Sequence, residues 1–428
     1  MKIKRLFPSL LTILVLAFQF SPLTYAENMD VPEGTEDVIK PSVSIEGKNG
    51  GWGYEDYIGK YGTVYGADEI KIDCFKSDTP YEISPGMLLK SKIEVPKDGL
   101  YELILTYKGK DRKDLLLSLE IDGQVPFAEA ESLIFPLSWV DHEKKRTDGN
   151  GNEIAPEQIP YDGFVSVKAK DYTGQHTRPY AFYLKAGTCE ITLKAISGSS
   201  FIQSVVFDNC NALLTYDEWL ENQNITDLSD EFICIEGENP ILKSDSSLIP
   251  LSDNTSPLVS PSNPVRDKLN YIGGSNWSKT GDSITWSFNV KTSGYYRLGF
   301  KYRQNIVLGG VSYRRMEIDG NPLFEEAERI KFPYTNKWKY AEFNNGKYPY
   351  LIYLDKGQHT LSLEVTTGEL STTYSNLKKI TSSLGDLYVD ITMVIGETVD
   401  IQRSYELFNQ IPNFNERLDQ NIGDLENV

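Results

Sequence analysis

The chain carries the same series of residues twice, and this internal repeat constrains the fold more than any other feature of the sequence. Gly99–Leu103, followed by Tyr107, recurs as Gly294–Leu298, followed by Tyr302. The shared order continues through these pairs: Glu120-Ile-Asp-Gly123 and Glu317-Ile-Asp-Gly320, Phe127 and Phe324, Glu129 and Glu326, Glu131 and Glu328, Phe135-Pro136 and Phe332-Pro333, Pro179-Tyr180 and Pro349-Tyr350. The chain is therefore expected to contain one domain type in two copies.

Within each copy, apolar side chains alternate with polar or small ones. The alternating sets are Tyr101, Leu103, Leu105 and Tyr107 in the first copy, and Tyr296, Leu298, Phe300 and Tyr302 in the second. A period of two puts such residues on one face of a strand, and Asp-Gly turns separate the strands. The pattern predicts an all-β chain of two tandem β-sandwiches with long loops.

The predicted domain boundaries place the first sandwich at 27–225 and the second at 226–400. A short helix that begins at the capping residue Thr215 is expected to join them. A short helical C-terminal tail is expected over 401–428, because Leu418, Ile422 and Leu425 fit one helical face.

One segment distinguishes the copies. The first copy has about forty residues between Trp139 and Pro179, whereas the second has ten between Trp338 and Pro349. The extra segment contains Asp148–Glu153, whose oxygen ligands at alternate positions suit a calcium loop. A surface turn is the alternative that we favour. Trp139 and Trp338 follow the matched Phe-Pro pair in both copies, which favours a shared structural role.

The N-terminus is typical of an export signal. Lys2, Lys4 and Arg5 precede a short apolar run, and small residues predict cleavage after Ala26, so residues 1–26 are a signal peptide and the mature protein is secreted. Removing the three cations takes the net charge from −18 to −21. Such a charge disfavours nucleic acid and membrane partners and suits divalent cations or neutral ligands.

The cysteines and histidines do not suggest a zinc site. Cys74, Cys189, Cys210 and Cys234 have no CxxC spacing, and the chain has only three histidines. An exported protein can form disulfides, although the sequence does not give their pairing. We favour buried free thiols.

The opening strands, the x-Asp-Gly hairpins and the closing strands resemble the galactose-binding-like, jelly-roll β-sandwiches of carbohydrate-binding modules. The phrases Gly294–Asn305, Ile352–Leu361 and Asp390–Gly396 also resemble the N-terminal half of bacterial extracellular solute-binding proteins of sugar ABC transporters. This second resemblance covers nearly the whole mature chain, but the two-lobed α/β solute-binding domain of such receptors is not present.

The resemblance to carbohydrate-binding modules implies a structural calcium ion held by carboxylates of the first and last strands. In the second copy these are Glu236, Glu238 and Asp390. In the first copy they are Glu46 and Asp208, with Lys48 at the place of Glu238. Calcium is therefore expected in the second copy.

Sugar sites combine exposed aromatic rings with polar groups that bind hydroxyls. The glycine- and aromatic-rich stretch after Gly50 supplies Trp52, Tyr54, Tyr57 and Tyr61, and the second copy supplies Trp277. The alternative, a loop that packs its own aromatics, is given equal weight.

The paired glutamates Glu129/Glu131 and Glu326/Glu328 could be acid–base groups of a glycosidase, but their duplication favours an exposed strand face. Catalytic motifs are absent from the sequence, so no enzyme is predicted. The leading hypothesis is a monomeric, secreted, non-catalytic protein that binds polysaccharide or oligosaccharide, in association with an ABC transporter or a cell-envelope protein. The alternatives are a structural or adhesive protein-binding sandwich, and an accessory binding part of a glycan-degrading system.

Overall fold

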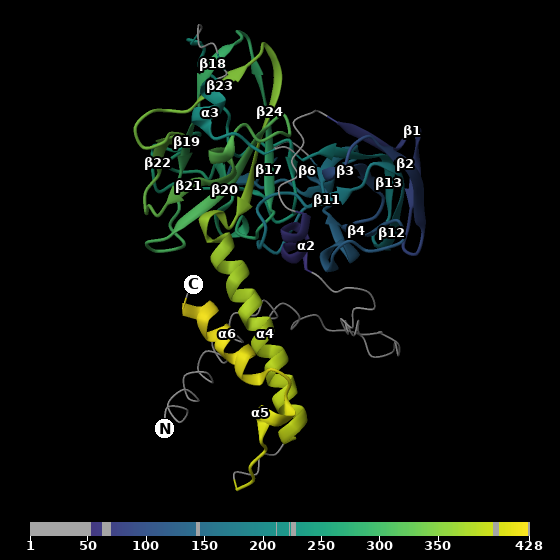
Figure 1. Ribbon diagram of the computed structural model, residues 1–428. Helices are drawn as coiled ribbons and strands as arrows, with labels where there is room; N and C mark the ends of the chain where they lie inside the picture. The colour runs from purple at the N-terminus through teal and green to yellow at the C-terminus, as the bar shows by residue number, and fades with distance from the viewer. Residues whose placement is uncertain are drawn as a thin grey trace, which may run out of the picture. The chain divides into compact units, whose positions relative to one another are not determined.

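The computed structural model describes residues 53–61, 70–142, 146–210, 212–221, 223, 228–396 and 402–426 (Figure 1). The chain divides into two compact units. One unit, Gly50–Ser371, contains both copies of the repeat, and the other contains the C-terminal helices that follow Ser371. In the described part of the chain, no helix has the length and apolar character needed to cross a bilayer.

The first copy is a β-sandwich of two antiparallel sheets. One sheet has the order β1–β13–β3–β10, with β11 also paired to β3, and the other has the order β2–β12–β4–β5. The strands are β1 (Lys71–Ile83), β2 (Leu88–Val95), β3 (Gly99–Gly109), β4 (Leu115–Ile121), β5 (Leu133–Phe135), β10 (Val165–Lys168), β11 (Ala181–Leu184), β12 (Gly187–Ser197) and β13 (Ser200–Asn209). The helix α2 (Tyr54–Tyr61) precedes them.

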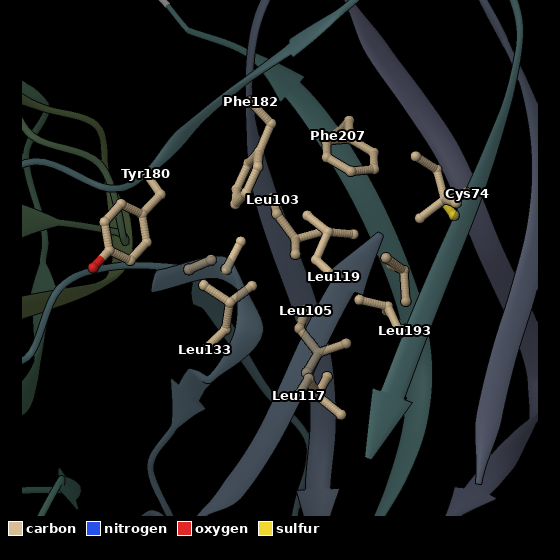
Figure 2. Packing of buried hydrophobic residues seen from close by; sticks show 14 of the residues in the cluster. Cys74, Leu103, Leu105, Leu117, Leu119, Leu133, Tyr180, Phe182, Leu193 and Phe207 are labelled. Atoms are coloured by element: carbon tan, nitrogen blue, oxygen red, sulfur yellow. The ribbon is translucent and has the colours of Figure 1, made fainter. Parts of the chain in front are cut away.

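The core of the first copy lies between these two sheets. Figure 2 shows Leu103 and Leu105 of β3 pointing toward Leu117 and Leu119 of β4, and all four are fully buried. The alternation that predicts β3 is thus confirmed, because its apolar face closes the sandwich.

The second copy places one large sheet against three short strand pairs. The large sheet has the order β21–β20–β24–β17–β14–β6–β9, and the pairs are β15–β16, β18–β23 and β19–β22. The strands are β14 (Leu242–Lys243), β15 (Pro250–Ser252), β16 (Leu269–Ile272), β17 (Ser283–Val290), β18 (Gly294–Arg297), β19 (Gly299–Tyr302), β20 (Val311–Ile318), β21 (Ile330–Pro333), β22 (Lys339–Glu342), β23 (Leu351–Leu354) and β24 (Gly357–Thr366). A core with Trp286, Met316, Phe324 and Leu363 lies between the layers.

The two Asp-Gly turns have the geometry that their sequence predicts. Asp122 and Gly123 have φ of 51° and 75°, and Asp319 and Gly320 have φ of 52° and 76°. Left-handed backbone at both central residues is the type I′ hairpin arrangement, which suits the twist of the flanking strands.

The extra segment of the first copy joins the two copies. Its strands β6 (Trp139–Asp141) and β9 (Gln158–Pro160) extend the large sheet of the second copy, and β7 (Arg146–Thr147) pairs with β8 (Glu153–Ile154). The Asp148 carboxylate accepts the backbone N–H groups of Asn150 and Asn152 at 2.8 and 2.9 Å. The Asp148 carboxylate therefore binds the backbone of its own turn over Asp148–Glu153, as expected for a surface turn.

Helix α3 (Tyr216–Glu221) begins where the sequence predicts. Thr215 and Glu218 cap it reciprocally, with the Thr215 N–H 2.9 Å from the Glu218 carboxylate and the Glu218 N–H 3.4 Å from the Thr215 hydroxyl. This is a capping box, which satisfies two backbone donors that a helix start leaves open.

The boundary of the second sandwich is wrong in the sequence analysis. Its strands end at β24, and the helix α4 (Ser371–Ile395) occupies residues that were assigned to the sandwich. Helices α5 (Leu407–Gln410) and α6 (Phe414–Glu426) follow, so the predicted tail is helical but the helical region begins about thirty residues earlier. The predicted apolar face of α6 is packed, because Leu418 contacts the cluster of Phe414, Ile411 and Leu387.

Candidate functional site

Two of the predicted sugar-binding tyrosines lie in the core of the first copy. Tyr54 and Tyr57 are on α2 and are 7% and 5% exposed. The Tyr54 ring lies 4.9 Å from the Phe127 ring and 4.7 Å from the Tyr180 ring. Their rings are therefore not open to a ligand, and the expectation of a glycine–tyrosine sugar platform is wrong at both. Trp52 lies outside the described residues.

This buried arrangement is itself part of the repeat. In the second copy Tyr216 opens α3, with its ring 5.0 Å from Phe324 and 4.6 Å from Tyr350. The Tyr54 hydroxyl accepts the N–H of Ala181 at 3.0 Å, and the Tyr216 hydroxyl accepts the N–H of Leu351 at the same distance. Both tyrosines thus fix the first residue of the equivalent strands β11 and β23. The matching sequences, Tyr-Glu-Asp-Tyr and Tyr-Asp-Glu-Trp, were a signal for this helix that the repeat comparison missed.

The remaining predicted aromatics have structural partners. Tyr61 is stacked on Tyr183 with 4.3 Å between the ring centroids. The Arg314 guanidinium lies over the Trp277 ring at 4.3 Å, and the Trp277 indole N–H donates to the carbonyl of Asp282 at 3.1 Å. Trp277 therefore uses its indole N–H and one face of its ring for contacts within the protein.

The predicted calcium ligands are not brought together as expected. Asp390 lies on α4 and forms a 2.6 Å ion pair with Arg417 of α6, so its assignment to a closing strand is wrong. Glu236 is exposed and Glu238 is buried, in a segment with no assigned strand. Asp208 lies on β13, 3.7 Å from Lys71. Glu46 is outside the described residues.

Among the residues that the structure describes, no three His, Cys, Asp or Glu side chains are grouped to hold a metal ion. Calcium binding through the remaining carboxylates stays a prediction. The four cysteines are free, with Cys74, Cys189 and Cys210 buried and Cys234 exposed.

A cluster in the second copy combines an aromatic ring, a cation and a carboxylate in the way that a sugar site does. The Asp253 carboxylate, 3% exposed, accepts the Trp338 indole N–H and an Arg303 guanidinium N–H, both at 2.6 Å. Its other oxygen accepts the Thr255 N–H at 2.8 Å and the Thr255 hydroxyl at 2.6 Å. One buried carboxylate thereby holds both the ring and the cation in place. We call Asp253, Tyr271, Arg303 and Trp338 the Asp253 cluster.

The ring and the cation also contact each other directly. The Arg303 guanidinium lies over the Trp338 ring at 5.3 Å, and the Tyr271 ring meets Trp338 at 5.6 Å in an edge-to-face arrangement. Cation–π and edge-to-face contacts of this kind restrain the rings. Trp338, Arg303 and Tyr271 each remain partly exposed, so part of each group is accessible to a ligand.

Strand ends position the cluster. Asp253 follows β15, Tyr271 lies on β16, Arg303 follows β19 and Trp338 precedes β22. The pairs β15–β16 and β19–β22 bring these ends together. The Asn270 side chain also fixes the backbone of Asp253. It accepts the Asp253 N–H at 2.9 Å and donates to the Asp253 carbonyl at 3.0 Å.

The protonation states in the cluster suit ligand binding. Burial by itself raises the pKa of Asp253, but hydrogen bonds from Thr255 and Trp338 and the charge of Arg303 outweigh it, and the pKa is lowered. Asp253 is therefore charged at neutral pH. Burial raises the pKa of Tyr271, which keeps its hydroxyl protonated.

The first copy uses the equivalent positions for contacts with its own extra segment and, through that segment, with the second copy. Lys108, at the place of Arg303, forms an ion pair with Asp162 of the extra segment. Trp139, which follows the matched Phe-Pro pair as Trp338 does, lies in β6 and pairs with Lys243 of the second copy. The expectation that Trp139 is structural agrees with this position, whereas Trp338 belongs to the Asp253 cluster.

The sequence analysis did not find Asp253, Arg303 and Tyr271. They are 50 residues or less apart in the sequence but lie on separate loops and strands, and no spacing rule links them. The one local signal was Asp253-Asn-Thr255, a pattern in which an Asp side chain caps its own turn.

Comparisons with known proteins give two findings. Residues 372–428 match the family described as the bacterial solute-binding protein, 4-helix bundle domain. No curated protein matches the chain.

Several solved structures of carbohydrate-binding modules resemble parts of the chain. One is a family 35 module from Clostridium thermocellum (12% identity, 34% of this chain and 95% of that chain, TM-score 0.20). Another is CBM35 from Paenibacillus barcinonensis (20%, 28% and 77%, TM-score 0.20). A third is the C-terminal CBM6 of LamC, a marine laminarinase from Zobellia galactanivorans (13%, 33% and 100%, TM-score 0.20). At these TM-scores the likeness carries no functional argument, which has to come from the site.

Proposed function

We propose that this chain is a non-catalytic carbohydrate-binding protein that acts outside the cell, and that its second copy binds polysaccharide or oligosaccharide at the Asp253 cluster. The observation that carries the proposal is the arrangement of Trp338 and Arg303 around one buried carboxylate. Aromatic rings stack on the apolar face of a pyranose, and planar cations and phenols bind its hydroxyls. Because Asp253 fixes these groups before a ligand arrives, little side-chain entropy is lost on binding.

A second ring lies close to Trp338. Tyr340 is 66% exposed and follows Trp338 by two residues at the start of β22. Alternate residues of extended backbone lie on the same face, about 7 Å apart. Trp338 and Tyr340 would then support neighbouring sugar units of an oligosaccharide.

The family match at 372–428 supports a role in solute capture. We propose that the protein presents sugar to an ABC transporter or another cell-envelope partner. The positive start and the apolar run of residues 1–26 support export.

A glycan array with the mature protein, followed by calorimetric titration of a glycan that binds, tests the proposal. Tyr340→Ala should weaken binding several-fold, since a stacked ring contributes about 1 kcal/mol and 1.4 kcal/mol is about tenfold in affinity. Trp338→Ala should weaken it more, because it removes a ring and also the cation–π contact that restrains Arg303.

Two variants serve as controls. Tyr348, 60% exposed on the turn before β23, is matched to Tyr340 in residue type and exposure, and Tyr348→Ala should leave the affinity unchanged. Trp277→Ala should lower stability without changing the affinity of the folded protein. Binding that survives both Trp338→Ala and Tyr340→Ala in a folded protein would remove the Asp253 cluster from the site.

A further inference from the structure

The strands β18 and β19 of the second copy carry a row of cations on their outward face. The alternate apolar residues of these strands pack against the second core, namely Tyr296, Leu298, Phe300 and Tyr302. Since successive side chains of a strand point to opposite faces, Arg297, Lys301 and Arg303 point away from that core. Arg297 and Lys301 are exposed, and Arg303 is partly exposed.

The neighbouring strand β22 places two rings on the same face. Tyr340 is paired directly with Lys301, and side chains of paired residues lie on one face of a sheet. Trp338 precedes Tyr340 by two residues and therefore shares this face. Its contact with Arg303, at 5.3 Å, agrees with that placement. We call Arg297, Lys301, Trp338 and Tyr340 the cationic face.

Gly299 gives the Tyr340 ring room to lie on the sheet. A Cβ atom at Gly299 would be 2.1 Å from the Tyr340 hydroxyl oxygen and 2.4 Å from the ring carbon that bears it, so a larger residue would displace the ring. Tyr340 nevertheless remains 66% exposed. A ring that lies against the backbone and is exposed to solvent on its other side is a platform for a pyranose.

The two exposed cations lie on either side of this platform. Arg297 and Lys301 are each two residues from Gly299, which is about 7 Å along an extended strand. Within the described part of the chain neither forms an ion pair, whereas the charge of Arg303 is balanced by Asp253 at 2.6 Å. The platform is therefore flanked by two cations whose charge is not neutralised by a neighbouring carboxylate.

The first copy has the same strands without this platform. At the places of Lys301 and Tyr340 it has Thr106 and Ser166, which are paired in the same way. Their hydroxyl oxygens lie 2.9 Å apart and satisfy each other. The equivalent face of the first copy therefore lacks both the ring and the lysine.

The remaining charges of this face are exchanged between the copies. Glu102 stands at the place of Arg297, and Lys168 at the place of Glu342. In the first copy the two residues form an ion pair at 2.8 Å. Among the described residues of the second copy, Arg297 and the half-buried Glu342 do not pair. Arg297 thus remains available for an anion that is not part of the chain.

We propose that the glycan bound by the second copy is a polyanion whose chain lies along β18–β19, with one sugar stacked on Tyr340 and acidic groups at Arg297 and Lys301. This inference rests on the proposed function and adds the substrate class. Uronic acid carboxylates and sulfate esters share the required chemistry, because guanidinium and ammonium groups bind the oxygen atoms of both. An exposed sheet face, unlike a closed pocket, accommodates the interior of a polymer.

The charge of the whole chain makes the two cations decisive. The net charge is −18, so the surface as a whole repels polyanions. Binding of an acidic glycan therefore depends on local contacts. Charge-assisted hydrogen bonds are stronger than those between neutral groups, so loss of Arg297 or Lys301 should weaken binding more than loss of a contact to a hydroxyl.

A glycan array with matched pairs of oligosaccharides tests the proposal on the mature full-length protein. One set places uronic acid oligosaccharides beside their carboxyl-reduced forms, and the other places sulfated oligosaccharides beside their desulfated forms. We expect the anionic members of at least one set to bind. Calorimetric titration should then give at least about tenfold weaker binding for the neutral counterpart. The set that binds shows whether the acidic group is a carboxylate or a sulfate.

Charge variants give the matched comparison. Lys301→Gln should weaken binding of the anionic member about tenfold, as expected for a lost charge-assisted hydrogen bond, and should change binding of the neutral counterpart much less. Lys92→Gln is the control, because Lys92 is an exposed strand lysine of the first copy and the net charge changes equally. Arg297→Gln should behave like Lys301→Gln, with the exposed Arg112→Gln as its control. All four variants should keep the wild-type melting temperature.

The outcomes separate this proposal from the proposed function. Neutral members that bind as tightly as their anionic partners, and that bind more weakly to Tyr340→Ala, would overturn the polyanion and leave the sugar site in place. Anionic members that bind Lys301→Gln and Arg297→Gln as tightly as the wild type, or that lose equal affinity in Lys92→Gln, would also overturn it. If no glycan of either kind binds, the proposed function fails together with the polyanion.

Discussion

Glu129 and Glu326 hold the same position in the two copies and perform the same task. Each carboxylate accepts the backbone N–H of the first helical tyrosine at 2.9 Å, Tyr54 in one copy and Tyr216 in the other. An acceptor at a helix start satisfies one of the donors that the helix leaves open, and its negative charge suits the positive end of the helix. Glu129 and Glu326 are therefore helix anchors rather than part of an exposed strand face, whereas Glu328 is buried and paired with Arg315.

Replacing Glu129 with alanine should lower the free energy of unfolding by about 1 kcal/mol, the usual cost of losing a helix cap. Glu131→Ala, at an exposed position two residues away, should change it much less. Urea unfolding of the two variants under the same conditions measures the difference. Equal losses would show that the hydrogen bond from the Tyr54 N–H to Glu129 does not contribute to stability.

Asp282 should make stability depend on pH in an unusual direction. Burial, and after it the negative charge of Asp245, raises the pKa of Asp282 to about 6, against the attraction of Lys279. The folded state then holds the proton more tightly than the unfolded state, so this contribution to stability is complete below about pH 4 and is lost as the pH rises through 6. Relative to Asp282→Asn, the wild-type protein should lose stability over that window.

Thermal unfolding of both proteins between pH 4 and pH 7.5 checks this expectation. Asp78→Asn, at an exposed position, is the control and should differ from the wild type by a constant amount. A constant difference for Asp282→Asn would contradict the raised pKa.

Individual site residues were harder to predict than the core. Apolar alternation identifies a buried stripe, because one face of a strand must be covered. The identity of an exposed ring is set by contacts from distant segments, as Phe127 and Tyr180 bury Tyr54. The Asp253 cluster likewise depends on three loops that meet only after the strands have paired.

At the level of elements, α4 shows how local preference and period can disagree. The helix is rich in β-branched residues, which favour strands, but the closing strand at Tyr388–Asp390 was predicted from the resemblance to carbohydrate-binding modules. Its apolar residues Leu377, Ile380, Leu384, Leu387, Ile391 and Val394 recur at alternating steps of three and four. Ile380, Leu384 and Leu387 are buried on this face, so the helical period was the better guide.

The contact between β6 and β14 depends on one buried ion pair. Lys243 is fully buried, 2.5 Å from the Asp141 carboxylate, and also donates to the Gln158 side chain. Burial lowers the pKa of Lys243, and Asp141 opposes that shift. Removal of the carboxylate would leave an uncompensated cation at the junction of the two copies.

Asp141→Ala should therefore cost about 3–5 kcal/mol, and Asp141→Ala combined with Lys243→Met should recover much of that loss, because no buried charge remains. The more exposed pair Lys268–Glu153, at 2.8 Å, is the comparison, and Lys268→Met should cost about 1 kcal/mol or less. Denaturant unfolding of the wild-type protein and the three variants gives these values. A double variant as unstable as Asp141→Ala would mean that packing, and not charge, accounts for the loss.

At the scale of the whole molecule, the duplication has produced two unequal copies. The first copy contains β13, and its extra segment adds the strands β6 and β9 to the large sheet of the second copy. The second copy lacks a β13 equivalent among its described residues and keeps the Asp253 cluster partly exposed. Because the two copies differ in this way, the repeat found in the sequence did not predict which copy holds the candidate site.

The division into units predicts that the helices and the sugar site can be separated. The cluster of Leu387, Ile411 and Phe414 shares no residue with either sandwich core. A chain that ends after Ser371 should therefore keep the fold of Gly50–Ser371 and bind the same glycan with the same affinity as the full chain, since every member of the Asp253 cluster is retained. Calorimetric titration measures the affinity, and thermal unfolding with saturating glycan should show the same stabilisation in both proteins, because a ligand that binds only the folded state stabilises it by mass action. A shortened chain that folds but loses affinity would place part of the site among residues 372–428, and the Asp253 cluster would then be an incomplete description of it.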